Sequence, residues 1–205
     1  MSERVGVSAA ERSPSGQASL RDLVRDRDPE PEHAFQVCML ALALFDATQE
    51  LHGLGAEERA LLEAGALLHD IGFARSASRH HKHSRDIVLS MDWPGAGPRE
   101  KAVVACVARY HRKAHPRSAH KIFRNLSPTD QELVTKLAAL LRLADGLDRT
   151  HTAAAESVRV DRLRQGIRLV VTQRRPTPTD IWGAMRKREL FEQAFGCSID
   201  VVPAQ

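Results

Sequence analysis

Apolar residues recur three and four positions apart through residues 29–152, the spacing at which side chains share one face of an α-helix. Pro31 and Pro98 suit the first turn of a helix, and Ser127 followed by Pro128 suits a cap and a first helical position. The predicted helices cover residues 32–51, 56–69, 83–91, 99–111 and 127–148. Between the last two of them, residues 112–126 are predicted to form a basic loop.

The pattern changes near residue 155. Residues 158–163 and 166–172 alternate apolar and polar side chains and predict two strands joined by a short turn. A helix over 179–195 and a third strand over 198–202 follow. We therefore predict a mainly α fold, a helical bundle with a small C-terminal α/β appendage. The predicted divisions are a disordered or loosely attached arm (1–28), the helical domain (29–152) and the appendage (153–205).

Composition and charge exclude some classes of protein. The 205 residues carry a formal charge of +4, too weak a balance to indicate a nucleic-acid binder. The three cysteines are far apart and form no CxxC pair, which suits a reducing compartment. The apolar run at 37–45 is too short to cross a bilayer, and the first residues lack an apolar signal core. We expect a soluble, cytoplasmic protein that does not act on membranes.

Several polar side chains lie on predicted apolar helix faces. His69 and Asp70 are adjacent at the end of an apolar helix, and His33 and Asp145 continue the apolar stripes of two other helices. His111 ends such a stripe and His83 begins one. These side chains therefore project inward from several helices. Gly65 precedes His69 on the same face and predicts close approach of another helix.

Two interpretations of these polar residues compete. A single histidine on an apolar face is most often a core residue bonded to a backbone carbonyl. A buried carboxylate needs a cation or several donors, because burying it alone costs several kcal/mol or more. Asp70 and Asp145 are both such carboxylates. Together with His33 and His69 they indicate a metal site, and a shell of imidazoles and carboxylates suits Mn, Fe, Zn, Co or Ni.

Other histidines and the basic residues are less specific. His80 and His81 fall in a predicted polar loop, and His52 and His151 are predicted at the surface. Arg112 and Lys113 lead a cluster of basic residues after His111 that either clamps phosphate oxygens or is a solvated loop. The cluster and a second group near residue 80 are Arg109, Arg112, Lys113, Arg117, Lys121, Arg124, Arg75, Arg79, Lys82 and Arg85.

These residues match a known pattern. His33, His69-Asp70 and Asp145 resemble the H…HD…D signature of the HD phosphohydrolase superfamily, an all-helical fold that binds one or two metal ions. Residues 28–200 are similar to the C-terminal helical domain of the exopolyphosphatase/guanosine pentaphosphate phosphatase family. The strings that carry this resemblance are Leu67-Leu-His-Asp-Ile-Gly, His80-His-Lys-His-Ser, Arg109-Tyr-His-Arg-Lys and Leu137-Ala-Ala-Leu-Leu-Arg-Leu-Ala-Asp-Gly-Leu-Asp-Arg.

The resemblance implies roles for particular residues. It makes His33, His69, Asp70 and Asp145 the first metal shell, and His83 and His111 the candidates for a second ion that Asp70 would bridge. It does not carry over the family's phosphate-chain hydrolysis, which belongs to actin-like domains with glycine-rich loops that this sequence lacks. The sequence after Asp70 also lacks the acidic pair of stringent-response nucleotide hydrolases.

Two functional hypotheses remain open. In the first, the chain is a metal-dependent phosphohydrolase of a small phosphorylated or polyphosphorylated ligand, with Asp70, Arg112 and Lys113 acting in catalysis. In the second, it is a non-catalytic module that binds polyphosphate or guanosine polyphosphate, or the partner of a separate exopolyphosphatase-like chain. Under both hypotheses the expected ligand is a phosphate-containing small molecule or polyphosphate. The extended strand edges and the last helix hint at a homodimer.

Overall fold

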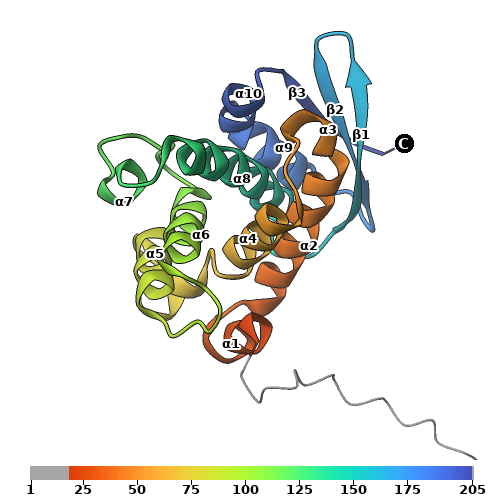
Figure 1. Cartoon of the computed structure of the whole chain (residues 1–205). Helices are drawn as coiled ribbons and strands as arrows, with labels where there is room; N and C mark the ends of the chain where they lie inside the picture. Colours follow the sequence, from red (N-terminus) through yellow and green to blue (C-terminus); the bar gives the residue numbers. More distant parts are fainter. Residues whose placement is uncertain (1–18, 205) are drawn as a thin grey trace, which may run out of the picture.

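The helices gather on one side of a three-stranded sheet (Figure 1). The computed structural model describes residues 19–204. It confirms the predicted mainly α fold with a C-terminal α/β appendage. The elements are α1 (Leu20–Arg27), α2 (Pro31–Ala47), α3 (Gln49–His52), α4 (Ala56–Leu67), the 3-10 helix η1 (Ile71–Ala74), α5 (His80–Ser90), α6 (Pro98–Tyr110), α7 (Lys121–Arg124), α8 (Pro128–Leu147), β1 (Ala155–Leu163), β2 (Gly166–Gln173), α9 (Pro178–Lys187), α10 (Glu189–Phe195) and β3 (Ile199–Pro203).

Local chemistry explains where the long helices begin. The Ser127 hydroxyl accepts a hydrogen bond from the backbone N–H of Asp130 at 3.1 Å and caps α8. Proline occupies the first position of α2, α6 and α8, where its missing N–H costs nothing. These starts agree with the sequence prediction to within a residue.

Two helices predicted as continuous are divided in the structure. The predicted helix over 32–51 becomes α2 and α3, because the Thr48 hydroxyl donates to the carbonyl of Leu44 at 2.7 Å and its backbone leaves the helical region. The predicted helix over 179–195 becomes α9 and α10, which meet at Arg188, where the backbone N–H donates to the carbonyl of Met185. Both divisions are local.

The structure corrects the predicted N-terminal arm. Residues 20–27 form α1, and its Ser19 cap makes a capping box with Asp22. Val24 is fully buried, and Leu20 and Leu23 pack beside it against the core. This i, i+3, i+4 stripe was present in the sequence but is only one turn long. The rest of the predicted arm, residues 1–18, lies outside the described residues.

The C-terminal sheet shares the core of the bundle. Its order is β1-β2-β3, with β1 and β2 antiparallel, β2 and β3 parallel, and α9 and α10 in the crossover. Ile167, Leu169 and Val171 alternate inward along β2, as the sequence pattern predicted. One hydrophobic cluster includes these side chains and those of α2, α4, α6 and α8. The appendage is therefore packed onto the bundle as part of the same core.

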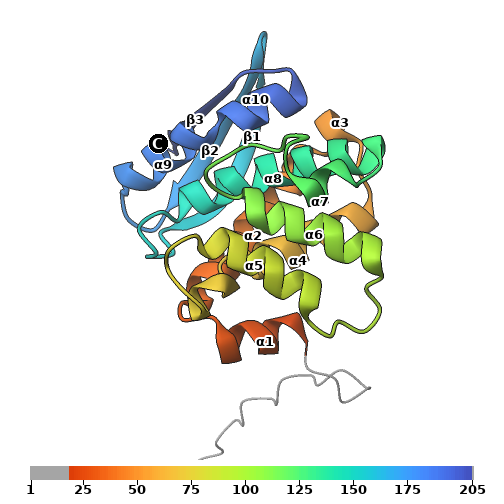
Figure 2. The ribbon, with the colours of Figure 1, turned by 90° about the vertical axis from the view of Figure 1, so that its left-hand side faces the viewer.

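Close helix contacts set the spacing of the bundle, whose helices α8, α6 and α5 lie one below the other in Figure 2. A Cβ added at Gly65 of α4 would lie 2.6 Å from Cγ1 of Val107 in α6, which confirms the predicted close approach. A Cβ at Gly72 would lie 2.2 Å from the carbonyl oxygen of His80. Glycine at 72 thus lets the start of α5 press against η1, next to His69 and Asp70.

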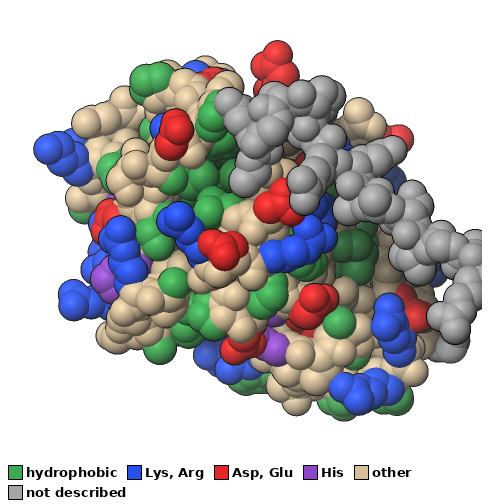
Figure 3. Space-filling view, turned by 90° about the horizontal axis from the view of Figure 1, so that it is seen from below, with side chains coloured by type: hydrophobic (Ala, Val, Ile, Leu, Met, Phe, Trp, Pro, Cys, Tyr) green, Lys and Arg blue, Asp and Glu red, His purple; other side chains and the backbone are tan. Residues whose placement is uncertain are grey.

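The surface carries both charges. Seen from below, acidic and basic side chains are interspersed over the middle of the face, while Lys, Arg and His gather at its left-hand edge (Figure 3).

The thiols of Cys38 and Cys106 are buried, and all three cysteines are free. No helix of residues 19–204 is long and apolar enough to pass through a bilayer.

Candidate metal centre

Five helix ends meet at one buried point. His33 lies in the first turn of α2, the pair His69-Asp70 follows the end of α4, and His80 begins α5. His111 follows the end of α6, and Asp145 lies in the last turn of α8. The sequence pattern therefore correctly brought His33, His69, Asp70, His111 and Asp145 to one place.

The four imidazoles are oriented alike. Nδ1 of His69 donates to the carbonyl of Ala66 and Nδ1 of His111 to that of Ala108, each at 2.7 Å. Nδ1 of His80 lies 3.1 Å from the carbonyl of Ala77. Nδ1 of His33 instead donates to a carboxylate oxygen of Asp148 at 2.8 Å, a contact that the sequence did not reveal. With Nδ1 held in this way, each ring offers Nε2 to the centre, as metal-binding histidines do.

Asp70 lies at the middle of the four rings. Its Oδ2 is 3.5 Å from Nε2 of His69 and 3.9 Å from Nε2 of His33. Its Oδ1 is 3.2 Å from Nε2 of His80 and 3.4 Å from Nε2 of His111. Two groups with metal-ligand spacing result: His33, His69 and Asp70 form one, and Asp70, His80 and His111 form the other. Ligands about 2.1 Å from a common ion lie roughly 3.0–3.5 Å apart, so the spacing suits an ion in each group.

Unpartnered buried atoms provide a test of whether an ion fits. Within residues 19–204, Nε2 of His33, Nε2 of His69 and Oδ1 of Asp70 are buried without a hydrogen-bond partner. A buried polar atom left in this way costs about 1–3 kcal/mol. All three point toward the centre, and divalent cations in the two groups would satisfy them. The residues present therefore fit the metal ions predicted from the sequence.

The second group departs from the sequence expectation. His80, not His83, joins Asp70 and His111, and among the described residues His83 belongs to neither group. The reason is that α5 begins at residue 80, three residues before the predicted start, so that His83 lies one turn further along the helix. The ring of His80 stacks on that of Phe73, with centroids 3.8 Å apart, and is buried.

Asp145 stands beside the first group. Its Oδ1 lies 3.7 Å from Nε2 of His33, and its other carboxylate oxygen pairs with the ammonium of Lys187. Burial opposes ionisation of Asp145, but the Lys187 charge and the His33 contact outweigh it and hold the pKa of this carboxyl well below its usual value. Lys187 comes from α9, so the appendage contributes to the site. The sequence did not identify Lys187 as a site residue, because the pattern around it indicated only a helix and carried no further motif.

The imidazoles differ in their affinity for protons. Burial lowers the pKa of His33, but its contacts with Asp145 and Asp148 more than compensate and raise it to about 10. Burial lowers the pKa of His111 to about 3, against the opposing charge of Asp70. His111 thus offers a neutral nitrogen at every physiological pH. A cation at the first group would have to displace the proton of His33.

A basic cavity of about 640 Å³ opens above Asp70 and the rings of the second group. Arg112 and Lys113, predicted as phosphate clamps, both line it, and Nη1 of Arg112 lies 3.0 Å from Nε2 of His80. The buried Arg142 donates to the carbonyl of Tyr110 at 2.9 Å and so fixes the start of this loop. The other lining residues are Phe73, Asp145, Arg149, His151, Thr179, Arg186 and Lys187.

His151 is exposed, as predicted, but it also borders the metal centre. Its ring stacks on that of His33, with centroids 3.7 Å apart, and its side chain is 38% exposed. Arg149 and Arg186, also missed by the sequence analysis, flank Trp182 with guanidinium carbons 5.3 and 5.4 Å from the ring centroid. The cavity therefore has cations on the α9 side as well as on the loop after α6.

The comparison with known families agrees with this arrangement. Residues 17–176 match the family model described as Ppx/GppA phosphatase, domain III. The matched segment contains both metal-ligand groups and the loop that carries Arg112 and Lys113. The chain belongs to the Ppx/GppA phosphatase domain III family.

Proposed function

We propose that the protein is a metal-dependent phosphohydrolase of the HD type that acts on a small phosphorylated or polyphosphorylated ligand. The observation that carries the proposal is the set of four imidazoles whose Nε2 atoms face Asp70 at the base of a basic cavity. Family membership supports an activity on phosphate compounds. A cytoplasmic location remains a proposal that fits the free cysteines.

One or two divalent transition-metal ions would occupy the centre. His33, His69, Asp70 and Asp145 would hold the first ion, and Asp70, His80 and His111 the second, with Asp70 between them. A bound ion supplies a Lewis acid for phosphoryl oxygens and lowers the pKa of water toward neutrality. The donor set of imidazole and carboxylate suits Mn, Fe, Zn, Co or Ni.

The cavity side chains would bind and orient the phosphate group. Arg112 and Arg186 can bind phosphoryl oxygens in bidentate fashion, and Lys113 adds a point charge. These cations favour a transition state in which charge gathers on the phosphoryl oxygens. The cavity volume of about 640 Å³ lies in the range of small-molecule sites and admits a ligand the size of a nucleotide.

Metal content and phosphate release test the proposal together. Purified protein supplemented with each metal should retain one or two ions per chain and release phosphate from nucleotides, phosphomonoesters or polyphosphate. His80→Gln should lower turnover at least a hundredfold, because it removes a ligand of the second group. His83→Gln is the matched control, one turn away on the same helix, and should leave metal content and turnover unchanged.

Two outcomes would contradict the proposal. Retention of no transition metal under these conditions would remove the metal centre. Tight binding of polyphosphate or guanosine polyphosphate without any phosphate release would instead identify a binding module.

A further inference from the structure

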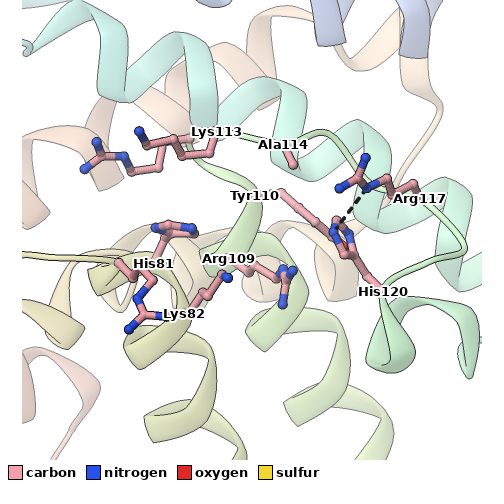
Figure 4. A pocket seen from close by; sticks show the side chains of 10 residues that line it. His81, Lys82, Arg109, Tyr110, Lys113, Ala114, Arg117 and His120 are labelled. Carbon is pink, nitrogen blue, oxygen red and sulfur yellow. Dashed lines mark hydrogen bonds between the residues drawn. The ribbon is translucent and has the colours of Figure 1, made fainter.

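A second, smaller cavity also borders the loop that carries Arg112 and Lys113. It measures about 310 Å³ and is built from the start of α5, the end of α6 and the loop that follows (Figure 4). It does not contain Asp70 or any of the four metal-facing histidines. Its lining residues are Arg79, His81, Lys82, Arg109, Tyr110, Arg112, Lys113, Ala114, Arg117 and His120.

Six of these side chains are cationic, and no acidic side chain of the described chain lines the cavity. Within residues 19–204, none of the six forms an ion pair with a carboxylate; Arg117 instead donates to the ring of His120 at 3.3 Å. Like charges gathered without counter-charge repel one another, and an anion in the cavity would relieve that repulsion.

His81 adds a directional group. The residue is only 7% exposed, and among the described residues its Nδ1 is a buried atom without a hydrogen-bond partner. It lines the cavity and is the second residue of α5, a helix of 11 residues. The positive end of the helix dipole, which favours anions, therefore lies beside an imidazole nitrogen that as Nδ1–H can donate to a phosphoryl oxygen.

The two cavities share two lining residues. Arg112 and Lys113 line both the cavity above the metal-facing histidines and this second one. We propose that the second cavity is a phosphate-binding subsite, which receives a further phosphoryl group of a ligand whose reacting phosphoryl group lies over Asp70. The substrate class would then be compounds with at least two phosphoryl groups. The assignment to a substrate rests on the proposed function, whereas phosphate binding in the cavity does not.

Binding to metal-free protein tests the subsite independently of catalysis. Chelator-treated protein is titrated with inorganic phosphate and with tripolyphosphate, and the heat of binding is measured. The double variant Lys82→Gln/Arg117→Gln should weaken tripolyphosphate binding at least tenfold, since each change removes a charge-assisted contact. Lys121→Gln, a basic residue of α7 outside both cavities, is the matched control and should bind as the wild type does.

The source of the phosphoryl group is then decided by kinetics on the metal-loaded protein. If the substrate supplies it, the double variant raises KM for tripolyphosphate at least fivefold relative to KM for a phosphomonoester. If the cavity binds only free phosphate, added phosphate changes the rate of phosphomonoester hydrolysis by the wild type but not by the double variant. That result overturns the assignment of the cavity to a phosphoryl group of the substrate. Unchanged binding of both phosphate and tripolyphosphate by the double variant overturns the subsite itself. Because the titration needs no turnover, an inactive protein would contradict the proposed function and leave this result intact.

Discussion

Nδ1 of His33 and a carboxylate oxygen of Asp148 lie 2.8 Å apart, and both side chains are at most 2% exposed. The contact fixes the ring so that Nε2 faces Asp70 and Asp145. Asp148→Asn should therefore weaken metal affinity 10–100-fold, as loss of such an orienting partner does. Competition with a chromophoric chelator measures the change. Asp200→Asn, an exposed carboxylate on β3, is the control, and equal affinity of both variants would argue against His33 as a ligand.

Metal removal should lower the melting temperature. An ion present at about 100 times its Kd stabilises the folded state by about 2.7 kcal/mol. For a chain of this size that is a shift of roughly 5–10 °C, measured by thermal unfolding with and without chelator. Asp70→Asn should abolish the metal-dependent shift, because both ligand groups lose their shared carboxylate. A shift of normal size in this variant would place the ion elsewhere.

Gly65→Ala should destabilise the protein by about 1–2 kcal/mol. The new Cβ would meet Cγ1 of Val107 at 2.6 Å, and overpacking of this kind outweighs the gain in helix propensity. Urea denaturation gives the free energy of unfolding. Adding Val107→Ala removes the obstructing methyl groups, so the double variant should lose less than the sum of the two single changes. Strict additivity would show that the two helices do not press together at this point.

Lys113 combines strain with charge. Its φ of 60° lies in the left-handed region, which costs a residue with a side chain about 1 kcal/mol. Lys113→Gly should therefore unfold at a higher urea concentration than Lys113→Ala, by about 1 kcal/mol in the free energy of unfolding. Both variants should bind phosphate compounds more weakly, since both lose the ammonium group shared by the two cavities. Equal stability of the two variants would contradict backbone strain at this position.

Acid should destabilise the protein partly through His52. The sequence placed this residue at the surface, but it is 7% exposed, with Nε2 donating to the carbonyl of Phe45 and Nδ1 accepting from the N–H of Leu54. Burial lowers the pKa of His52 below its ordinary 6.5 in the folded state. As the pH falls below about 6.5, the unfolded chain takes up the proton first, and stability is lost.

The melting temperature of His52→Gln should therefore fall less than that of the wild type between pH 7.5 and pH 5.5. The comparison of the two decreases removes the contribution of the other histidines. Parallel decreases would mean that His52 accepts a proton in the folded protein as readily as in the unfolded chain.

The spacing of apolar residues by itself determined the mainly α fold and the inward direction of His33, His69, Asp70, His111 and Asp145, and the alternation of apolar and polar residues determined the C-terminal strands. This was possible because the face on which a side chain lies depends only on its position within one helix. The starts of the long helices were equally local, since caps and prolines act within one turn. Errors in the predicted helix boundaries were local too. The helix α5 begins three residues before its predicted start, and His80 rather than His83 joins Asp70 and His111.

Only the tertiary structure decided which partners these residues meet. Asp148 orients His33 from 115 positions away, and Lys187 reaches Asp145 from the appendage. It also showed that Arg112 and Lys113 line two basic cavities, whereas the sequence presented one basic cluster after His111. Such relationships depend on how helices and sheet pack against one another, and that packing is a property of the whole core rather than of any single segment.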